Sequence, residues 1–310
     1  LTWAGTFFML QWSSKSNSNR TTTPMKHRIL IPSLALIVSA SLSAQTTVLE
    51  LRFNDPTTST TAANSGSLGS ALDGTLEDDI GTVQLGSTTG VSGLVGDRAF
   101  DNTQTVGHEG ADSARVSVGN LGNIPTHESF TISFWQRHNS PAATSGTRFI
   151  SDFGNFVVVE PGGGVDAGIR VADGTDAIVS GNGALDTSEW QFIAFTVDGT
   201  GTTDNFKLFT GTETSAVQEI VSGSISASSF SPSGTMAIGN QILNFNSGFD
   251  GLIDNVLITI SETGSAGALS LSDLESQRQF DVSTIPEPSS FALLGGSLAF
   301  ALLSRRRRRR

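Results

Sequence analysis

The feature that most constrains the fold is a series of short segments in which apolar and polar residues alternate. They recur roughly every ten to fifteen residues between Gly-containing turn pairs such as Asp73-Gly74 and Asp198-Gly199, which supply the positive φ that tight hairpins require. This spacing is typical of a β-sandwich or barrel and not of βαβ units. The clearest predicted strands are 47–53, 115–118, 130–138, 148–152, 156–160, 168–171, 190–197, 206–209, 218–222, 235–238 and 252–260.

Two of these segments predict how the sheets are covered. In 130–138 the period of two places Phe130, Ile132 and Phe134 on a core face, and we expect the opposite face, which carries Trp135, to be nearly wet. In 190–197 apolar residues fill both faces, so this strand should be central and covered on both sides. Two stacked sheets account for both patterns. Only 271–279 is predicted as helix, following Ser270.

Charge and cysteine content narrow the classes of function. Residues 45–285 contain 28 acidic and 8 basic residues, a net charge of −20. Such a charge repels nucleic acid and anionic lipid and favours cations, so we expect no nucleic-acid partner. The chain has no cysteine, which excludes disulfides, a thiolate nucleophile and a thiolate metal site.

The N-terminal residues predict export. Met25-Lys26-His27-Arg28 is a basic start, an apolar run follows over 29–38, and small residues over 39–44 supply a cleavage zone, so residues 25–44 are interpreted as a secretory signal peptide. Residues 1–24 are interpreted as upstream sequence outside any domain, the alternative being an extended basic region of the signal. The predicted domain covers residues 45–282.

The C-terminal residues predict where the exported chain goes. Pro286-Glu287-Pro288 precedes an apolar run over 291–303, and six arginines follow from Arg305. A helix over 289–304 spans about 24 Å, short of a bilayer core of about 30 Å, so it can only just bridge the membrane. The arginines should stay on the cytoplasmic side. An ordinary short membrane anchor is the alternative. Segment 283–310 resembles the PEP-CTERM sorting signal of Gram-negative bacteria, in which an exosortase processes the tail after export. The resemblance implies a cell-surface, outer-membrane or extracellular-matrix location, with a transient or retained membrane segment.

The strands carry a second resemblance. The matching pieces are Leu49 to Asp55, Ala99-Phe100-Asp101, Phe130 to Trp135, Glu189 to Gly199, Phe249 to Val256 and the closing segment Leu269 to Glu275. In this order they resemble the laminin-G-like jelly roll of the concanavalin A-like lectin/glucanase superfamily. The resemblance implies an all-β fold, an antiparallel two-sheet jelly-roll sandwich whose first and last strands pair, flanked here by the signal peptide and the C-terminal sorting helix. Residues 139–188 match no part of this pattern.

The same resemblance implies a calcium ion that joins the first strand to the last. The matching positions are Asp254, with Asn54 or Asp55 after the first strand. Calcium prefers six to eight oxygen ligands, which this acidic region offers. The alternative is that Asp254 only caps a turn and that Asp55 begins a loop. The expected role of the ion is structural.

Sugar binding would use an exposed aromatic ring with polar neighbours on a concave face. Trp135, beside Arg137, is the candidate for this ring. Asn244 and Asn246, in the loop before the last predicted strand, are candidates for the rim of a binding site. The alternative for Trp135 is packing under a long loop.

Enzymatic activity is not expected. Glucanases of this fold carry two Glu and one Asp at the spacing E-x-D-x-x-E on one strand, because glycoside hydrolysis needs two nearby carboxyl groups, and no such run exists here. The sequence therefore predicts an exported, surface-associated binding or structural module that contacts extracellular polysaccharide or another matrix component. The alternatives are a glycoside hydrolase or polysaccharide lyase with an unrecognised site, and a purely architectural surface protein.

Overall fold

A computed structural model gives the fold of the chain. It divides into two units, Leu1–Ser41 and Leu42–Arg310, and every residue described below belongs to the second. The structure describes residues 44–77, 84–103, 114–139, 147–154, 156–159, 169–173, 176–181, 184–185, 189–242 and 247–283. Residues 25–43 of the predicted signal peptide and the sorting residues Pro286, Glu287, Pro288 and Arg305 lie outside these ranges.

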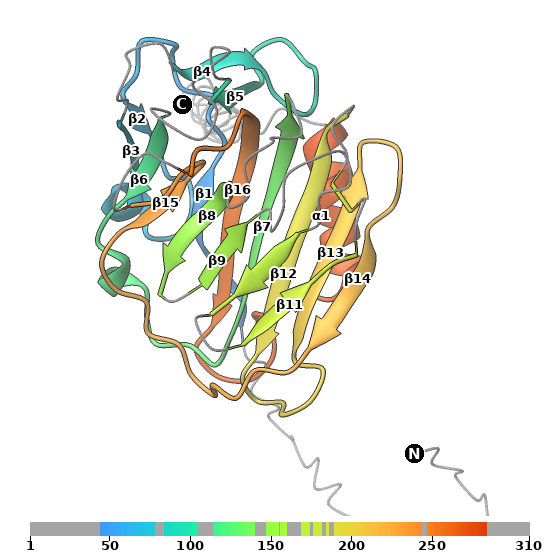
Figure 1. The fold of residues 1–310 in the computed structure, drawn as a ribbon. Coiled ribbons are helices and arrows are strands. Elements are labelled where there is room, and N and C mark those ends of the chain that lie inside the picture. Colours follow the sequence, from blue (N-terminus) through green and yellow to red (C-terminus); the bar gives the residue numbers. More distant parts are fainter. Residues whose placement is uncertain are drawn as a thin grey trace, which may run out of the picture. The chain divides into compact units, whose positions relative to one another are not determined.

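Two antiparallel sheets, each of eight strands, form the domain (Figure 1). One sheet, called here the inner sheet, has the order β14-β13-β12-β7-β16-β5-β4, and β1 also pairs with β16. Its strands are β1 (Thr46–Leu51), β4 (Gln84–Thr89), β5 (Arg98–Asp101), β7 (Ser129–His138), β12 (Gln191–Asp198), β13 (Phe206–Thr212), β14 (Gln218–Gly223) and β16 (Gly251–Ser261).

The other sheet, called here the outer sheet, has the order β11-β10-β9-β8-β15-β6-β3-β2. Its strands are β2 (Thr61–Ala62), β3 (Gly74–Glu77), β6 (Arg115–Val118), β8 (Arg148–Phe153), β9 (Phe156–Val159), β10 (Arg170–Ala172), β11 (Ala177–Val179) and β15 (Met236–Ile238), and two short 3-10 helices, Gly69–Leu72 and Leu121–Asn123, lie in the connections. The all-β, two-sheet prediction is confirmed.

The first and last strands lie side by side, as predicted. Strand β1 pairs antiparallel with β16, with Thr46 opposite Ile260 and Leu51 opposite Val256. Strand β16 also pairs with β7 along most of its length. The last strand of the sandwich is therefore at the centre of the inner sheet.

The main core fills the space between the two sheets. Phenylalanine rings dominate it: Phe130, Phe156, Phe195 and Phe206 form a chain of contacts with ring centroids 5.1–6.3 Å apart. Strand β12 is flanked by β7 and β13 and buried on both faces up to Val197, which confirms the prediction for residues 190–197.

The second face of β7 is covered by a helix, so the expectation that it is nearly wet is wrong. Helix α1 (Leu271–Ser283) lies against this face, and a smaller apolar cluster fills the space beneath it. Backbone and side-chain hydrogen bonds complete the cover: the Thr131 hydroxyl donates to the carbonyl of Gly267, and Gln277 donates to Ser133. Polar residues on this strand face therefore bind protein groups.

Helix α1 begins where the sequence predicted, because Ser270 caps it. The Ser270 hydroxyl accepts from the amide of Asp273 at 3.3 Å, and the Asp273 carboxylate accepts from the amide of Ser270 at 3.2 Å. The helix continues to Ser283, four residues past the predicted end. Among the described residues no helix is long and apolar enough to cross a membrane.

Candidate functional site

Two buried carboxylates meet at the end of the sandwich where β4, β5 and β16 come together. Asp254 of β16 is fully buried, and its Oδ2 accepts from the amide of Val91 at 3.0 Å while its Oδ1 accepts from the amide of Asn255 at 2.7 Å. The β16–β7 register shifts directly after Asp254, and Asn255 has φ of 48°. This bulge turns the Asp254 carboxylate away from the strand ladder and toward the β4–β5 hairpin.

The second carboxylate belongs to Asp97, which is 3% exposed. Its Oδ2 accepts from the amide of Ser92 at 2.8 Å, and its Oδ1 has no hydrogen-bond partner. Both carboxylates converge on Gly90: a Cβ placed there would lie 2.6 Å from Asp254 Oδ2, 2.6 Å from Asp97 Oδ2 and 2.7 Å from the carbonyl oxygen of Arg98. Glycine at position 90 therefore lets three oxygens approach one point of the backbone.

The pKa of Asp254 lies well above its ordinary value. Burial is the largest cause, and the charge of Asp97 raises it further, whereas the amides of Val91 and Asn255 lower it. Within the described part of the chain neither Asp97 nor Asp254 forms an ion pair with Lys or Arg. The site therefore concentrates negative charge that a bound cation would neutralise.

Asn54 reaches the same site. Its Oδ1 accepts from the amide of Arg98 at 2.7 Å, and its Nδ2 is buried without a partner. Asp55 is differently engaged, because its carboxylate accepts from the amide of Ala63 and its carbonyl oxygen accepts from the Arg98 guanidinium. Of the residues predicted to bind a metal, the structure therefore brings Asp254 and Asn54 to this site beside Asp97, whereas the Asp55 carboxylate is bound elsewhere. Sequence reasoning missed Asp97, which stands two residues before Ala99-Phe100-Asp101.

The oxygen atoms at this site are of the kind that a hard cation prefers, but the acidic side chains alone are too few to hold one. No group of three or more His, Cys, Asp or Glu side chains able to hold a metal occurs among the described residues. Calcium, however, also binds amide and carbonyl oxygens. The carbonyl oxygen of Arg98 lies with the two carboxylates beside Gly90, and Asp97 Oδ1 has no hydrogen-bond partner. Two carboxylates and neighbouring uncharged oxygens are therefore available at this end of the domain.

Trp135 does not provide an exposed aromatic ring for sugar binding in this structure. Its side chain is fully buried beneath α1, its ring contacts Phe192, and its Nε1–H donates to Asp281 Oδ2 at 3.0 Å. Burial on both sides leaves no surface on which a sugar could stack. Arg137 is exposed and lies over the ring of Trp190, 5.3 Å from its centroid. Asn244 and Asn246 lie outside the described residues.

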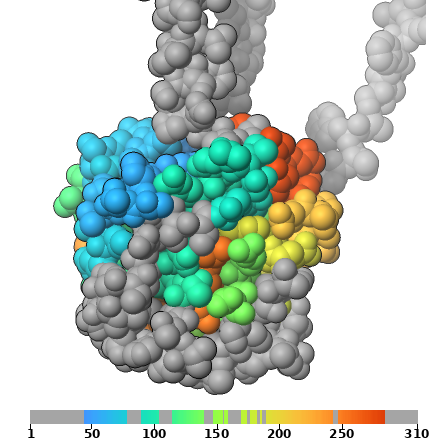
Figure 2. Space-filling view, turned by 90° about the horizontal axis from the view of Figure 1, so that it is seen from above, coloured from blue at the N-terminus to red at the C-terminus, as the bar shows by residue number. Residues whose placement is uncertain are grey.

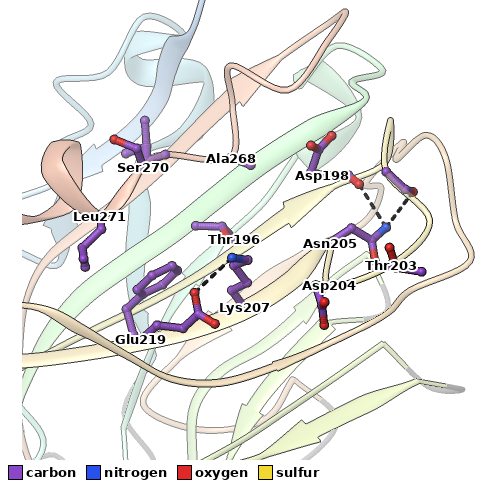
Figure 3. A pocket seen from close by; sticks show the side chains of 13 residues that line it. Thr196, Asp198, Thr203, Asp204, Asn205, Lys207, Glu219, Ala268, Ser270 and Leu271 are labelled. Carbon is purple, nitrogen blue, oxygen red and sulfur yellow. Dashed lines mark hydrogen bonds and ion pairs between the residues drawn. The ribbon is translucent and has the colours of Figure 1, made fainter. Parts of the chain in front are cut away.

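A polar groove lies on the inner sheet beside the start of α1 (Figure 3). Strands β12, β13 and β14 form one side and the segment before α1 forms the other, and the volume of the open groove is about 380 Å³. Lys207 of β13 and Glu219 of β14 point toward each other there, with Nζ 3.0 Å from Oε2, and each is 38% exposed. Their exposure leaves donor and acceptor positions free for a ligand.

The rest of the groove combines polar and apolar groups, and hydrogen bonds hold the turn at one end of it. Asn205 holds the β12–β13 turn, since its Nδ2 donates to the carbonyls of Asp198, Gly201 and Ile225. Its remaining lining supplies further acidic, hydroxyl and apolar groups: Asp198, Thr203, Asp204, Phe209, Ser270 and Leu271. Leu271 is 47% exposed, so the groove has an apolar edge as well as polar groups. No pattern in the sequence predicted this groove, because its two sides lie about 50 to 75 residues apart in the chain.

The two antiparallel sheets define an all-β sandwich of the concanavalin A-like type. Residues 109–261 match the laminin G family profile described as the concanavalin A-like lectin/glucanases superfamily, and residues 284–309 match the PEP-CTERM protein-sorting motif. The chain thus carries a concanavalin A-like, laminin-G-type domain followed by a PEP-CTERM sorting motif. That motif implies export, sorting to the cell surface and processing by an exosortase. No curated protein matches the chain.

Several solved structures are similar to it at low identity. Domain 4 of AbnA, an extracellular arabinanase of Geobacillus stearothermophilus solved with arabinotriose, is 16% identical with a TM-score of 0.46, over 74% of this chain and 98% of that one. A heptameric SAP-like pentraxin of Limulus polyphemus is 9% identical with a TM-score of 0.33, over 52% and 71%. A carbohydrate-binding module of a Ruminococcus gnavus sialidase, bound to sialyllactose, is 16% identical with a TM-score of 0.34, over 52% and 92%.

Proposed function

We propose that this protein is a surface-sorted, non-catalytic module that binds an extracellular polysaccharide in the groove between β12–β14 and the start of α1. The observation that carries the proposal is the exposed Lys207–Glu219 pair beside an apolar edge in a preformed groove. Sugar rings offer hydroxyl groups around a less polar ring face. A site with fixed acceptors, one ammonium donor and a neighbouring apolar surface suits both parts of a sugar.

Charge indicates which polysaccharides suit the groove. Asp198, Asp204 and Glu219 line it, and Lys207 is its only basic residue among those that the structure describes. Three carboxylates against one ammonium disfavour a polyanionic glycan and favour a neutral or amino-sugar polymer. The domain's excess of acidic residues acts in the same direction.

The proposal assigns no catalytic role to the groove. The E-x-D-x-x-E motif of the glucanases is absent from the sequence, and the Glu219 carboxylate is engaged with Lys207. A hydrolase would need one carboxyl group held protonated as an acid beside a second carboxylate. Incubating the protein with a polysaccharide panel and measuring new reducing ends tests this point, since release of ends would establish an enzyme.

We further propose that Asp97, Asp254 and Asn54 hold a structural calcium ion. Such an ion would link the β4–β5 hairpin and the end of β1 to β16, supplying charge neutralisation where two buried carboxylates face each other. Its contribution would be to stability, because the polar groove lies on other strands.

Affinity electrophoresis in gels that contain a neutral, an amino-sugar or an anionic polysaccharide tests the binding proposal. We expect retardation by the first two, and about ten-fold weaker retardation for Glu219→Gln and Lys207→Met, since each removes an interaction of roughly 1.4 kcal/mol. Glu213→Gln is the matched control, because Glu213 is an exposed acid of the β13–β14 loop outside the groove. Equal retardation of all variants would remove the groove from the proposal.

A further inference from the structure

The β4–β5 hairpin presents two apolar side chains to solvent at its tip. Val95 is 99% exposed and Leu94 is 44% exposed. The tip is nevertheless well built: Gly90 and Asp97 are joined by a backbone hydrogen bond of 3.0 Å, and Asp97 and Asp254 bind the amides of Ser92 and Val91. A loop held this firmly displays its apolar residues as a fixed feature of the surface.

The hairpin lies at the end of the sandwich where α1 finishes. Val91, at the base of the loop, belongs to the apolar cluster under α1, and Val282 of the last helical turn packs against the same cluster. Figure 2, which looks down on this end, shows the surface of the β4–β5 region in teal beside the red surface of α1. Phe280, also in the last turn, is 47% exposed.

The sorting motif starts directly after this helix. Residue 284, the first of the matched motif, is bonded to Ser283, the last residue of α1, and the apolar run begins at Phe291. The eight residues from 284 to 291 reach at most about 28 Å. Strand β16 begins at Gly251, at the hairpin end of the domain (the near end), and ends at Ser261 (the far end), about 34 Å away along the strand. Once the apolar run is in a bilayer, the near end of the domain is therefore the end that meets the lipid.

We infer that the tip of the β4–β5 hairpin, Leu94 and Val95, rests in the interfacial region of the membrane that holds the sorting segment, and that Phe280 lies at the same surface. The occupant is a phospholipid surface. Two side chains bind lipid weakly alone, but the tether keeps their local concentration at the membrane high. This orients the domain with the hairpin toward the lipid until the tail is processed.

Charge predicts which lipids suit this contact. The domain is strongly acidic, so an anionic surface repels it, and the hairpin tip itself carries only Ser, Gly, Leu and Val between Val91 and Asp97. The contact should form on zwitterionic phosphatidylethanolamine and phosphatidylcholine. It should also withstand added salt, because burial of apolar groups is not screened.

The absence of cysteine makes a site-specific test straightforward. Val95→Cys and, as control, Ser265→Cys are labelled with the environment-sensitive fluorophore NBD in the full chain and reconstituted in zwitterionic vesicles. Ser265 is exposed and lies beyond the end of β16 at the far end of the domain. We expect the emission at position 95 to rise about three-fold, to resist added salt and to be quenched by lipids that carry nitroxides, with no change at position 265.

Each alternative outcome is informative. The inference is overturned if the NBD emission at position 95 stays at its value in water. It is also overturned if the emission rises only when a second membrane protein is added, because the tip would then bind a protein partner. An equal rise at both positions would also overturn it, since the domain would then lack a preferred orientation. Leu94→Ser in the labelled Val95→Cys chain should reduce the emission rise, and polysaccharide retardation of the same chain monitors folding independently.

Discussion

Arg52 and Asp281 join the end of the first strand to the last turn of the C-terminal helix. Arg52 Nη1 donates to Asp281 Oδ1 at 2.6 Å, and the other carboxylate oxygen of Asp281 accepts from the indole of Trp135. Burial raises the pKa of Asp281, whereas Arg52 and Trp135 lower it. Residues 229 positions apart thus share one buried polar network, in which every charge has a partner.

Removing one member of this network should strongly destabilise the domain. Arg52→Met leaves the Asp281 carboxylate buried without its cation, and we expect a loss of about 3–5 kcal/mol in the free energy of unfolding. Urea denaturation followed by tryptophan fluorescence measures it. Arg52→Met combined with Asp281→Asn should cost less than the sum of the single changes, and strict additivity would show that the two side chains act independently.

Gly90→Ala should destabilise the domain, although a glycine-to-alanine change usually stabilises a protein slightly where the backbone conformation allows alanine. Its Cβ would lie 2.6 Å from the carboxylate oxygens of Asp97 and Asp254, so the hairpin must shift, at a cost of about 1–3 kcal/mol. Gly122→Ala is the matched control, because nothing lies within 4 Å of a Cβ at that position. Thermal melts that place Gly90→Ala at or above the control would contradict the close convergence on residue 90.

Calcium should raise the melting temperature of the parent protein above that measured in chelator. At a concentration one hundred times its dissociation constant an ion adds about 2.7 kcal/mol to the free energy of unfolding. Asp97→Asn should abolish most of this gain, whereas Asp55→Asn should retain it, since Asp55 binds Ala63 instead. Differential scanning calorimetry separates the two, and equal losses would restore Asp55 to the ligand set.

Glu275 should contribute stability that acid removes. The Arg278 guanidinium, 2.7 Å from Oε1, is the main cause that lowers the pKa of Glu275 from 4.5 to about 2. A lowered folded-state pKa means that the stabilisation is complete above pH 4.5 and is lost as the pH falls toward 2. Because the carboxylate is partly exposed, we expect only about 1 kcal/mol.

The variant Glu275→Gln tests this pH dependence. Its deficit relative to the parent protein, measured by urea denaturation, should be present at pH 6 and vanish near pH 2. Glu213→Gln should follow the parent protein at both values. A deficit that persists unchanged at low pH would mean that Glu275 acts through its size and its contact with the Val217 amide instead of its charge.

Much of the fold could be predicted because the pattern of apolar residues along each long strand shows which of its faces are buried. Strand β12, apolar on both faces, was placed correctly at the centre of a sheet, and the pairing of β1 with β16 was expected. Strands β2, β3, β4 and β11 were missed, since they have two to six residues and their pairing depends on neighbours distant in the chain. The covering of Trp135 was also missed, because alternation along β7 cannot show that a helix more than 130 residues later lies upon it.

The site was predictable in part for the same reason. Asp254 was singled out because it matches the position that the family resemblance assigns to a calcium ligand, and the structure places it in a buried carboxylate pair. Its partner Asp97 lies in a Gly-rich hairpin where no periodicity marks one acid from another. The groove beside α1 arises only from tertiary packing, so its lining residues carry no local pattern.

The placement of β16 has a consequence for the order of assembly. This strand forms the middle of the inner sheet, and α1, which seals Trp135, is made later still. The sheet has an open seam between β7 and β5 until residues 251–283 are present, and pairings of such long sequence separation form slowly. Nascent chains that stall before residue 283 should therefore remain protease-sensitive. Every chain that includes the sorting motif after α1 has also been synthesised through the last strand and the helix of the domain.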